Sequence, residues 1–117
     1  MIEKILIEYL SEYAHIPVFM EKPDSPPESP PESYVLVEKT GSNRQNQIET
    51  AMIAVQSYAG SMAKAAELNR QIKDLMLDCI VLDEIGGCSL NSDYNFTDTS
   101  TKEYRYQAVF NITYYGG

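Results

Sequence analysis

Residues 102–115 read KEYRYQAVFNITYY. Apolar and aromatic side chains occupy every second position from Tyr104 to Tyr114, and polar side chains fill the positions between them, apart from Val109. This alternation predicts a β-strand with one buried face. A strand of about a dozen residues is not stable alone, so we expect neighbouring strands and a helix over its apolar face.

The length and charge of the chain limit what it can be. Its 117 residues suffice for one hydrophobic core, so we expect a single domain over residues 1–117. Seventeen Asp and Glu against nine Lys and Arg give a net charge of −8. Because phosphate contacts need clustered cations, nucleic acid is disfavoured as a bound ligand. No apolar run approaches the roughly 20 residues of a membrane span and no signal-peptide pattern opens the chain, so we expect a cytoplasmic protein without membrane contact.

Two segments have the periodicity of amphipathic helices. Residues 2–13 place Ile, Leu and Tyr at helical spacing, and Pro17 limits this helix at its end. Residues 61–78 repeat the pattern, with Ser61 placed as an N-cap. The apolar stripes of both helices are suited to cover a sheet.

Short segments elsewhere have strand character. Residues 16–21 are extended, and residues 34–40 form a strand that we expect to end in a turn at 41–43. Residues 88–96 alternate like a half-buried strand, and the polar connector at 97–101 joins them to the terminal strand as an antiparallel hairpin.

The segment at 47–59 fits two patterns. Its apolar side chains match a helical stripe and also a strand that is apolar on both faces. We predict a central strand, because Gly60 supplies a break before the following helix and because the family resemblance described below places a strand here.

Residues 23–33, PDSPPESPPES, contain the tetrapeptide PPES twice. Prolines fix φ and remove backbone donors, so we expect a stiff, polyproline-like loop over residues 22–33. It is either a plain hairpin arm or a docking arm for an aromatic-lined groove. Three acidic residues and the absence of a flanking Arg argue against the usual recognition of proline-rich ligands.

Together these elements predict an α+β fold. We expect a single, mainly antiparallel sheet of about five strands, two helices packed on one face, and a long Pro-rich hairpin arm. If both helices cover the same face, the other face stays exposed and partly aromatic, and such a surface usually seeks a partner.

No arrangement of residues predicts catalysis. The single histidine, His15, precedes a proline at a helix end, where a capping or surface role is expected. Cys79 and Cys88 lack a metal-ligand spacing and are expected to be small buried apolar residues. The neighbouring carboxylates Asp83 and Glu84 point opposite ways and do not make an acid and base pair. We therefore expect no catalytic residue, metal or cofactor, and no enzyme activity.

The last third of the chain resembles a known family. LNSDYNF at 90–96, Asp98, YRYQA at 104–108 and ITYY at 112–115 are similar to the ending of small tail-terminator and tail-completion proteins of long-tailed bacteriophages and prophages. The earlier order of helix, strands and helix also resembles that family, so the likeness covers nearly the whole chain. The duplicated PPES arm is longer than the family's pattern requires.

The resemblance implies a structural role. In that family the protein assembles as a ring, typically a hexamer, on the head-proximal end of the tail tube, where it stops tube growth and offers the surface for head attachment. The implied partners are further copies of the chain, the tail-tube protein and a head-completion or neck protein, in the host cytoplasm during assembly and then in the virion. Six copies at −8 carry about −48, so DNA passes through the ring without specific binding.

Two groups of residues are predicted to form protein contacts. One is a polar loop after Gly41 that touches the tail tube or a neighbouring subunit, made of Arg44, Gln45, Asn46 and Gln47. The other is Arg105, which we expect to pair with Asp98 or Asp93 within the terminal hairpin or to make a contact across subunits.

Two alternative functions stay open from the sequence. One is a head-completion or neck adaptor that binds the portal instead of the tube. The other is a small acidic protein-binding inhibitor, although the carboxylates are spread among lysines and form no dense array.

Overall fold

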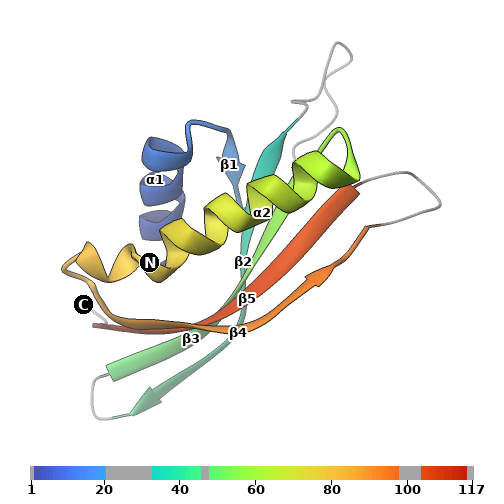
Figure 1. The fold of residues 1–117 in the computed structure, drawn as a ribbon. Helices are drawn as coiled ribbons and strands as arrows, with labels where there is room; N and C mark the ends of the chain where they lie inside the picture. The colour runs from blue at the N-terminus through green and yellow to red at the C-terminus, as the bar shows by residue number, and fades with distance from the viewer. Residues whose placement is uncertain (1, 21–32, 46–47, 98–103, 116–117) are drawn as a thin grey trace.

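The computed structural model describes residues 2–20, 33–45, 48–97 and 104–115. In chain order its elements are α1 (Ile2–Ala14), β1 (Val18–Phe19), β2 (Tyr34–Gln45), β3 (Ile48–Ala59), α2 (Met62–Leu77), the short 3-10 helix η1 (Cys79–Val81), β4 (Ile85–Asn95) and β5 (Tyr104–Tyr115). The sheet has the order β1-β2-β3-β5-β4, and only the β1–β2 pair is parallel (Figure 1). The predicted α+β fold with a mainly antiparallel sheet is confirmed. The Pro-rich arm, except Ser33, lies outside the described residues.

Both helices lie on the same side of the sheet (Figure 1). Leu6 and Leu10 of α1 and Ile72 and Met76 of α2 are fully buried against strand residues that include Phe110. Burying each such side chain stabilises the fold by about 1.5–3 kcal/mol. The two helices are also joined directly, because the Tyr9 hydroxyl of α1 donates to the Leu75 carbonyl oxygen of α2 at 2.7 Å.

The hairpin of β2 and β3 differs from its prediction in one respect. The turn expected at 41–43 is wrong: β2 continues to Gln45, with a register shift between Lys39 and Gly41. Gly41 does not have a positive φ, so the left-handed conformation that would favour glycine in a tight turn is absent at this position. The strand predicted at 47–59 is confirmed as β3, the central strand. The segment that is apolar on both faces is thus the strand that has a hydrogen-bonded neighbour along each edge, β2 and β5.

The edge strand β4 has two irregularities. Its register with β5 shifts between Ile85 and Gly87 and again between Leu90 and Ser92. After the second shift, even-numbered residues of β4 point to the other face of the sheet. Cys88 therefore points to the helices, while Tyr94 points to the opposite face. The prediction of one regular alternation over 88–96 is therefore wrong. Extra residues of this kind are typical of edge strands.

The ends of the helices follow the expected local chemistry. The Ser61 hydroxyl caps α2 by accepting a hydrogen bond from the Lys64 backbone N–H at 3.2 Å. After α1, exposed His15 has a φ of 59°, the left-handed conformation that often follows a helix. Asp93 of β4 holds α2 to the sheet by accepting a hydrogen bond from Asn69 at 2.8 Å and pairing with Lys73 at 2.5 Å.

Candidate interaction surface

The face of the sheet away from the helices carries a row of ring and guanidinium groups. Tyr34, Tyr58 and Arg105 lie directly opposite one another on β2, β3 and β5. Phe96, just after β4, continues the row because its backbone N–H donates to the Arg105 carbonyl oxygen at 2.9 Å. We call Tyr34, Tyr58, Arg105 and Phe96 the aromatic row.

The members of the aromatic row stack on one another. The rings of Tyr34 and Tyr58 are parallel within 8°, with centroids 4.5 Å apart, and Phe19 of β1 meets Tyr34 edge-on at 6.2 Å. The guanidinium carbon of Arg105 lies 4.5 Å from the Phe96 centroid and 5.6 Å from the Tyr58 centroid. Arg105 Nη1 also donates to the Tyr58 hydroxyl at 2.8 Å, so stacking and hydrogen bonding fix the same side chain.

A second row, two residues along each strand from the first, has two glutamine amides at its centre. Its members Leu36, Gln56, Gln107 and Tyr94 also lie opposite one another, and we call them the amide row. Gln107 Nε2 donates to the Tyr94 hydroxyl, and Gln56 Nε2 donates to Gln107 Oε1 at 2.7 Å. The Tyr58 hydroxyl donates to Gln56 Oε1 at 2.8 Å and links the two rows. Such a connected network holds side chains in one arrangement.

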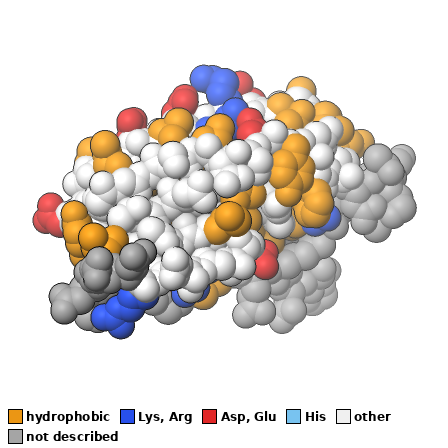
Figure 2. Space-filling view, turned by 90° about the horizontal axis from the view of Figure 1, so that it is seen from below, with side chains coloured by type: hydrophobic (Ala, Val, Ile, Leu, Met, Phe, Trp, Pro, Cys, Tyr) orange, Lys and Arg blue, Asp and Glu red, His pale blue; other side chains and the backbone are white. Residues whose placement is uncertain are grey.

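The charge of this face differs from that of the whole chain. Seen from below the view of Figure 1, most of the visible surface is uncharged, and hydrophobic side chains form several separate patches on it (Figure 2). Aromatic residues and arginine are enriched at protein interfaces, whereas Glu, Asp and Lys are depleted. On a protein with a net charge of −8, we identify this open face as the candidate interaction surface.

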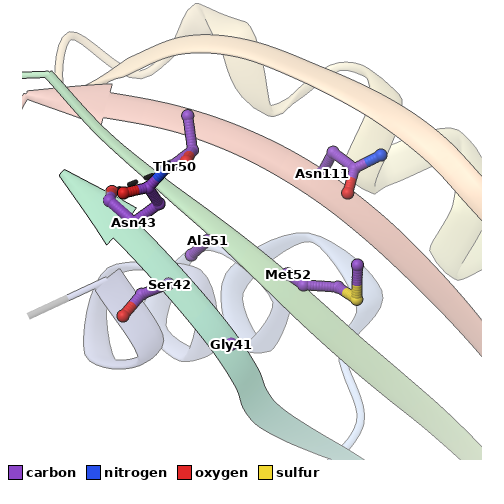
Figure 3. Close-up of a pocket in the computed structure, with 7 residues that line it drawn as sticks. All are labelled: Gly41, Ser42, Asn43, Thr50, Ala51, Met52 and Asn111. Carbon is purple, nitrogen blue, oxygen red and sulfur yellow. Dashed lines mark hydrogen bonds between the residues drawn. The ribbon is translucent and has the colours of Figure 1, made fainter. Parts of the chain in front are cut away.

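A hollow of about 250 Å³ lies on the same face, toward the β2–β3 hairpin (Figure 3). It is lined by Gly41, Ser42, Asn43, Thr50, Ala51, Met52 and Asn111. The Thr50 hydroxyl donates to the Asn43 carbonyl oxygen at 3.5 Å. None of these seven residues is ionisable, so the hollow supplies amides, hydroxyls and a thioether but no general acid or base.

The predicted contact residues lie at opposite ends of the sheet. Arg44 belongs to β2 near the hairpin and is mostly exposed, with Nε 3.9 Å from Glu49 Oε1. Arg44 pairs with Glu49 of β3, which pairs with Tyr114 of β5. Tyr114 is nine positions from Arg105, so about 30 Å of strand separates Arg44 from Arg105. Gln45 ends β2, while Asn46, Gln47 and Asp98 lie outside the described residues. The structure therefore does not bring Arg44 and Arg105 together.

The predicted pairing of Arg105 with Asp93 is wrong. Asp93 points to the helix side, where Lys73 and Asn69 hold it, because the second β4 register shift changes its face. Arg105 instead contacts Tyr58 and Phe96. The pairing with Asp98 falls outside the described residues. The sequence analysis missed Tyr34, Tyr58 and the amide row, because only the strand register places them side by side.

The two cysteines meet on the helix side. Cys79 is fully buried and Cys88 is half-buried against the same core. A hydrogen bond from the Cys88 thiol lowers the pKa of Cys79, and the same contact together with burial raises the pKa of Cys88.

Within residues 2–20, 33–45, 48–97 and 104–115, no three His, Cys, Asp or Glu side chains gather as a metal site. In that same part of the chain, no helix is long and apolar enough to span a membrane.

Comparison with known proteins does not assign a family. No protein-family model matches the chain, and no curated protein matches its sequence. The function is therefore inferred from the residues and surfaces of the chain itself.

Proposed function

We propose that this protein is a structural, non-enzymatic ring subunit of the phage tail-terminator kind. It assembles as a hexamer at the head-proximal end of the tail tube, stops tube elongation and provides the surface to which the head attaches. The resemblance of residues 90–115 to that family supports this role, and so does the mostly uncharged, partly aromatic open face of an otherwise acidic protein.

The observation that carries the proposal is that the two edges of the sheet are formed by different strands. On one side β4 is paired only with β5, and on the other side the described part of β2 beyond Leu36 is paired only with β3. A contact between two different surfaces of identical chains repeats from copy to copy and closes into a ring when the rotation permits. A sheet whose two edges differ is suited to such a head-to-tail contact, because one edge of a copy can meet the other edge of the next.

The charge of the chain supports a channel for DNA. Six copies at −8 carry about −48, and carboxylates facing a channel repel a phosphate backbone that must pass without sticking. The described cations are also dispersed: Arg70 and Lys73 pair with acidic residues on or near α2, and Arg105 lies between aromatic rings. This arrangement favours passage of DNA over binding.

Electron microscopy of the purified protein mixed with separately polymerised tail tubes from the same virus tests the proposal. Rings that cap one tube end, on tubes that no longer lengthen, are the expected result. Bare tubes together with binding to DNA-filled heads would assign the protein to the portal side. Binding to neither would contradict the ring proposal and favour the inhibitor alternative.

Arg44 provides a residue-level test of the same proposal. We expect Arg44→Glu to weaken tube capping or ring formation, because this exposed cation lies beside the β2–β3 hairpin and has only the 3.9 Å contact to Glu49 within the described residues. Arg70→Glu, a charge reversal on the exposed face of α2, is the matched control. Unchanged folding, ring formation and tube binding in Arg44→Glu would remove Arg44 from the interface.

A further inference from the structure

The two cysteines of the chain belong to segments that the fold brings together. Cys79 begins η1 and Cys88 lies in β4, and η1 packs against the beginning of β4 (Figure 1). Two backbone hydrogen bonds reverse the chain between them: the Leu82 N–H donates to the Cys79 carbonyl oxygen at 3.0 Å, and the Ile85 N–H donates to the Leu82 carbonyl oxygen at 3.1 Å. The backbone itself therefore returns Cys88 to the neighbourhood of Cys79.

The side chains of both cysteines face the same part of the core. Cys88 pairs in register with Ile112 of β5 and packs against the buried cluster that contains Ile112 and Cys79. The two thiols are in hydrogen-bonding contact. Cys79 is fully buried, whereas Cys88 is only half-buried. A small reagent can thus reach one thiol of the pair, and the other thiol is enclosed beside it.

The strand next to Cys88 has room to adjust. A disulfide bond is about 2.05 Å long, so contacting sulfur atoms must approach one another further to form it. The register of β4 against β5 shifts between Ile85 and Gly87, directly before Cys88, and the regular ladder of hydrogen bonds is interrupted there. A small movement of Cys88 toward Cys79 therefore does not have to break a continuous ladder.

We propose that Cys79 and Cys88 form a redox modification site, at which a low-molecular-weight disulfide such as oxidised glutathione produces an intramolecular disulfide. The Cys88 thiolate attacks one sulfur of oxidised glutathione, whose sulfur–sulfur bond breaks and releases one glutathione thiolate. The Cys79 thiolate then attacks the Cys88 sulfur of the mixed disulfide and displaces the second glutathione. The cysteine pair loses two electrons and two protons, and the two released glutathione molecules carry them.

The new bond fastens η1 to the edge of the sheet. η1 carries Ile80 and Val81, which expose 56% and 72% of their surface, and β4 is an edge strand. In the reduced protein, backbone turns and packing hold η1 in place, whereas in the oxidised protein a covalent link also limits its separation from β4. The redox state therefore sets how firmly this apolar end of the molecule is held. The inference does not depend on ring assembly, because both thiols belong to one copy of the chain.

A redox titration of the full-length protein tests the site. The protein is brought to equilibrium with mixtures of reduced and oxidised glutathione, once folded and once in urea, starting from both oxidation states, and acid-quenched samples are analysed by mass spectrometry. Because the sequence has two cysteines, a monomer that has lost two hydrogen atoms contains the disulfide between Cys79 and Cys88. Since folding has already brought the ends of this loop of about ten residues together, the folded protein should favour the disulfide roughly a hundredfold more than the unfolded chain.

The same factor must appear in the stability of the protein. A thermodynamic cycle links folding to oxidation, so the unfolding equilibrium constant of the oxidised protein should be smaller than that of the reduced protein by the factor found in the titration. Urea unfolding of the two forms measures it.

Hydrogen exchange locates the effect within the fold. The backbone amides of Leu82 and Ile85, which hold the turns between the cysteines, should exchange about tenfold more slowly in the oxidised protein. The Lys64 amide, which donates to Ser61 at the other end of α2, should keep its rate. Cys88→Ser is the matched control, because it keeps a small side chain at this half-buried position and removes the thiol that reacts first. Glutathione mixtures should leave the exchange of Leu82 and Ile85 unchanged in this variant.

Three outcomes would overturn the proposal. If the folded protein favours the disulfide no more than the unfolded chain does, the fold does not hold the thiols in an arrangement that can bond. If only disulfides between chains or mixed disulfides with glutathione form, Cys79 does not reach the Cys88 sulfur. If oxidation leaves the exchange of Leu82 and Ile85 unchanged, the bond does not fasten η1 to β4.

Discussion

The guanidinium of Arg105 lies over the ring of Phe96 while its Nε donates to the backbone carbonyl oxygen of the same residue at 2.7 Å. One side chain thus joins β5 to the end of β4 both by stacking and by a hydrogen bond. Lysine has neither the planar surface nor the fixed donor geometry for both contacts.

We therefore expect Arg105→Lys to lower the free energy of unfolding by about 1–2 kcal/mol, the sum of a cation–π contact and a hydrogen bond. Urea unfolding measures the change. Arg44→Lys, at the opposite end of the sheet with one 3.9 Å contact, is the control and should leave the midpoint in place. Equal stability of Arg105→Lys and the unchanged protein would show that charge alone matters at this position.

Asp93 is the polar link between α2 and β4. Asp93→Ala removes the acceptor for the amide of Asn69, which is only 3% exposed, and the partner of Lys73. A buried amide that loses its hydrogen bond is costly, so we expect the free energy of unfolding to fall by about 1–3 kcal/mol in thermal or urea unfolding. Glu67→Gln, which breaks the exposed pair with Arg70, should have no measurable effect. If both variants behave alike, Asn69 finds another partner.

Stability should decline at high pH because of two buried tyrosines. Burial, chiefly, raises the pKa of Tyr9 to about 12, and burial followed by the hydrogen bond to Glu49 does the same for Tyr114. An unfolded tyrosine ionises near pH 10, so above that pH the unfolded state loses these protons first. The stabilisation is complete below pH 10 and is lost as the pH rises from 10 to 12. Unfolding measured across this range should show the decline.

Tyr9→Phe separates the contribution of Tyr9. Below pH 10 it should cost about 1 kcal/mol, because the Leu75 carbonyl oxygen loses its donor, and between pH 10 and 12 the decline should be shallower. Tyr13→Phe, on the exposed side of α1, is the matched control and should cost less than Tyr9→Phe below pH 10. An unchanged slope in Tyr9→Phe would contradict the raised pKa.

The paired thiols should be protected from aromatic disulfide reagents. Cys79 is inaccessible, and the contact with Cys79 helps to keep the pKa of Cys88 high, so both should react slowly at pH 8 in the folded protein and rapidly in urea. Cys79→Ala removes that contact and should accelerate the reaction of Cys88 severalfold. An unchanged rate would mean that limited access, not the neighbouring thiol, protects Cys88.

The local sequence pattern predicted the helices and strands better than it predicted the register between neighbouring strands. The helices at 2–13 and 61–78 and the terminal strand have strong periodicity over a dozen or more residues, and α1, α2 and β5 follow it closely. The turn expected at 41–43 failed because Gly, Ser and Asn also occur where an extended strand bulges. Nothing in the local sequence of 88–96 distinguishes a regular strand from one with an extra residue, so the change of face in β4 was not predictable.

The interaction surface was predictable only in part. An exposed and partly aromatic second face was expected from two helices on one side, and Arg105 was recognised as the cation of the terminal strand. Its partners were not, because Tyr58 is 47 positions away in sequence and only the register of β3 against β5 places it opposite Arg105. Opposite charge suggested a carboxylate partner, but an aromatic ring occupies that place.

The two register shifts in β4 also bear on aggregation. They divide this edge into two regular runs, Gly87–Leu90 and Ser92–Asn95, each shorter than the six or seven consecutive residues that stack into amyloid-like fibrils. Bulges also turn an edge away from flat pairing with another strand. The β4 edge therefore carries its own barrier to fibre growth.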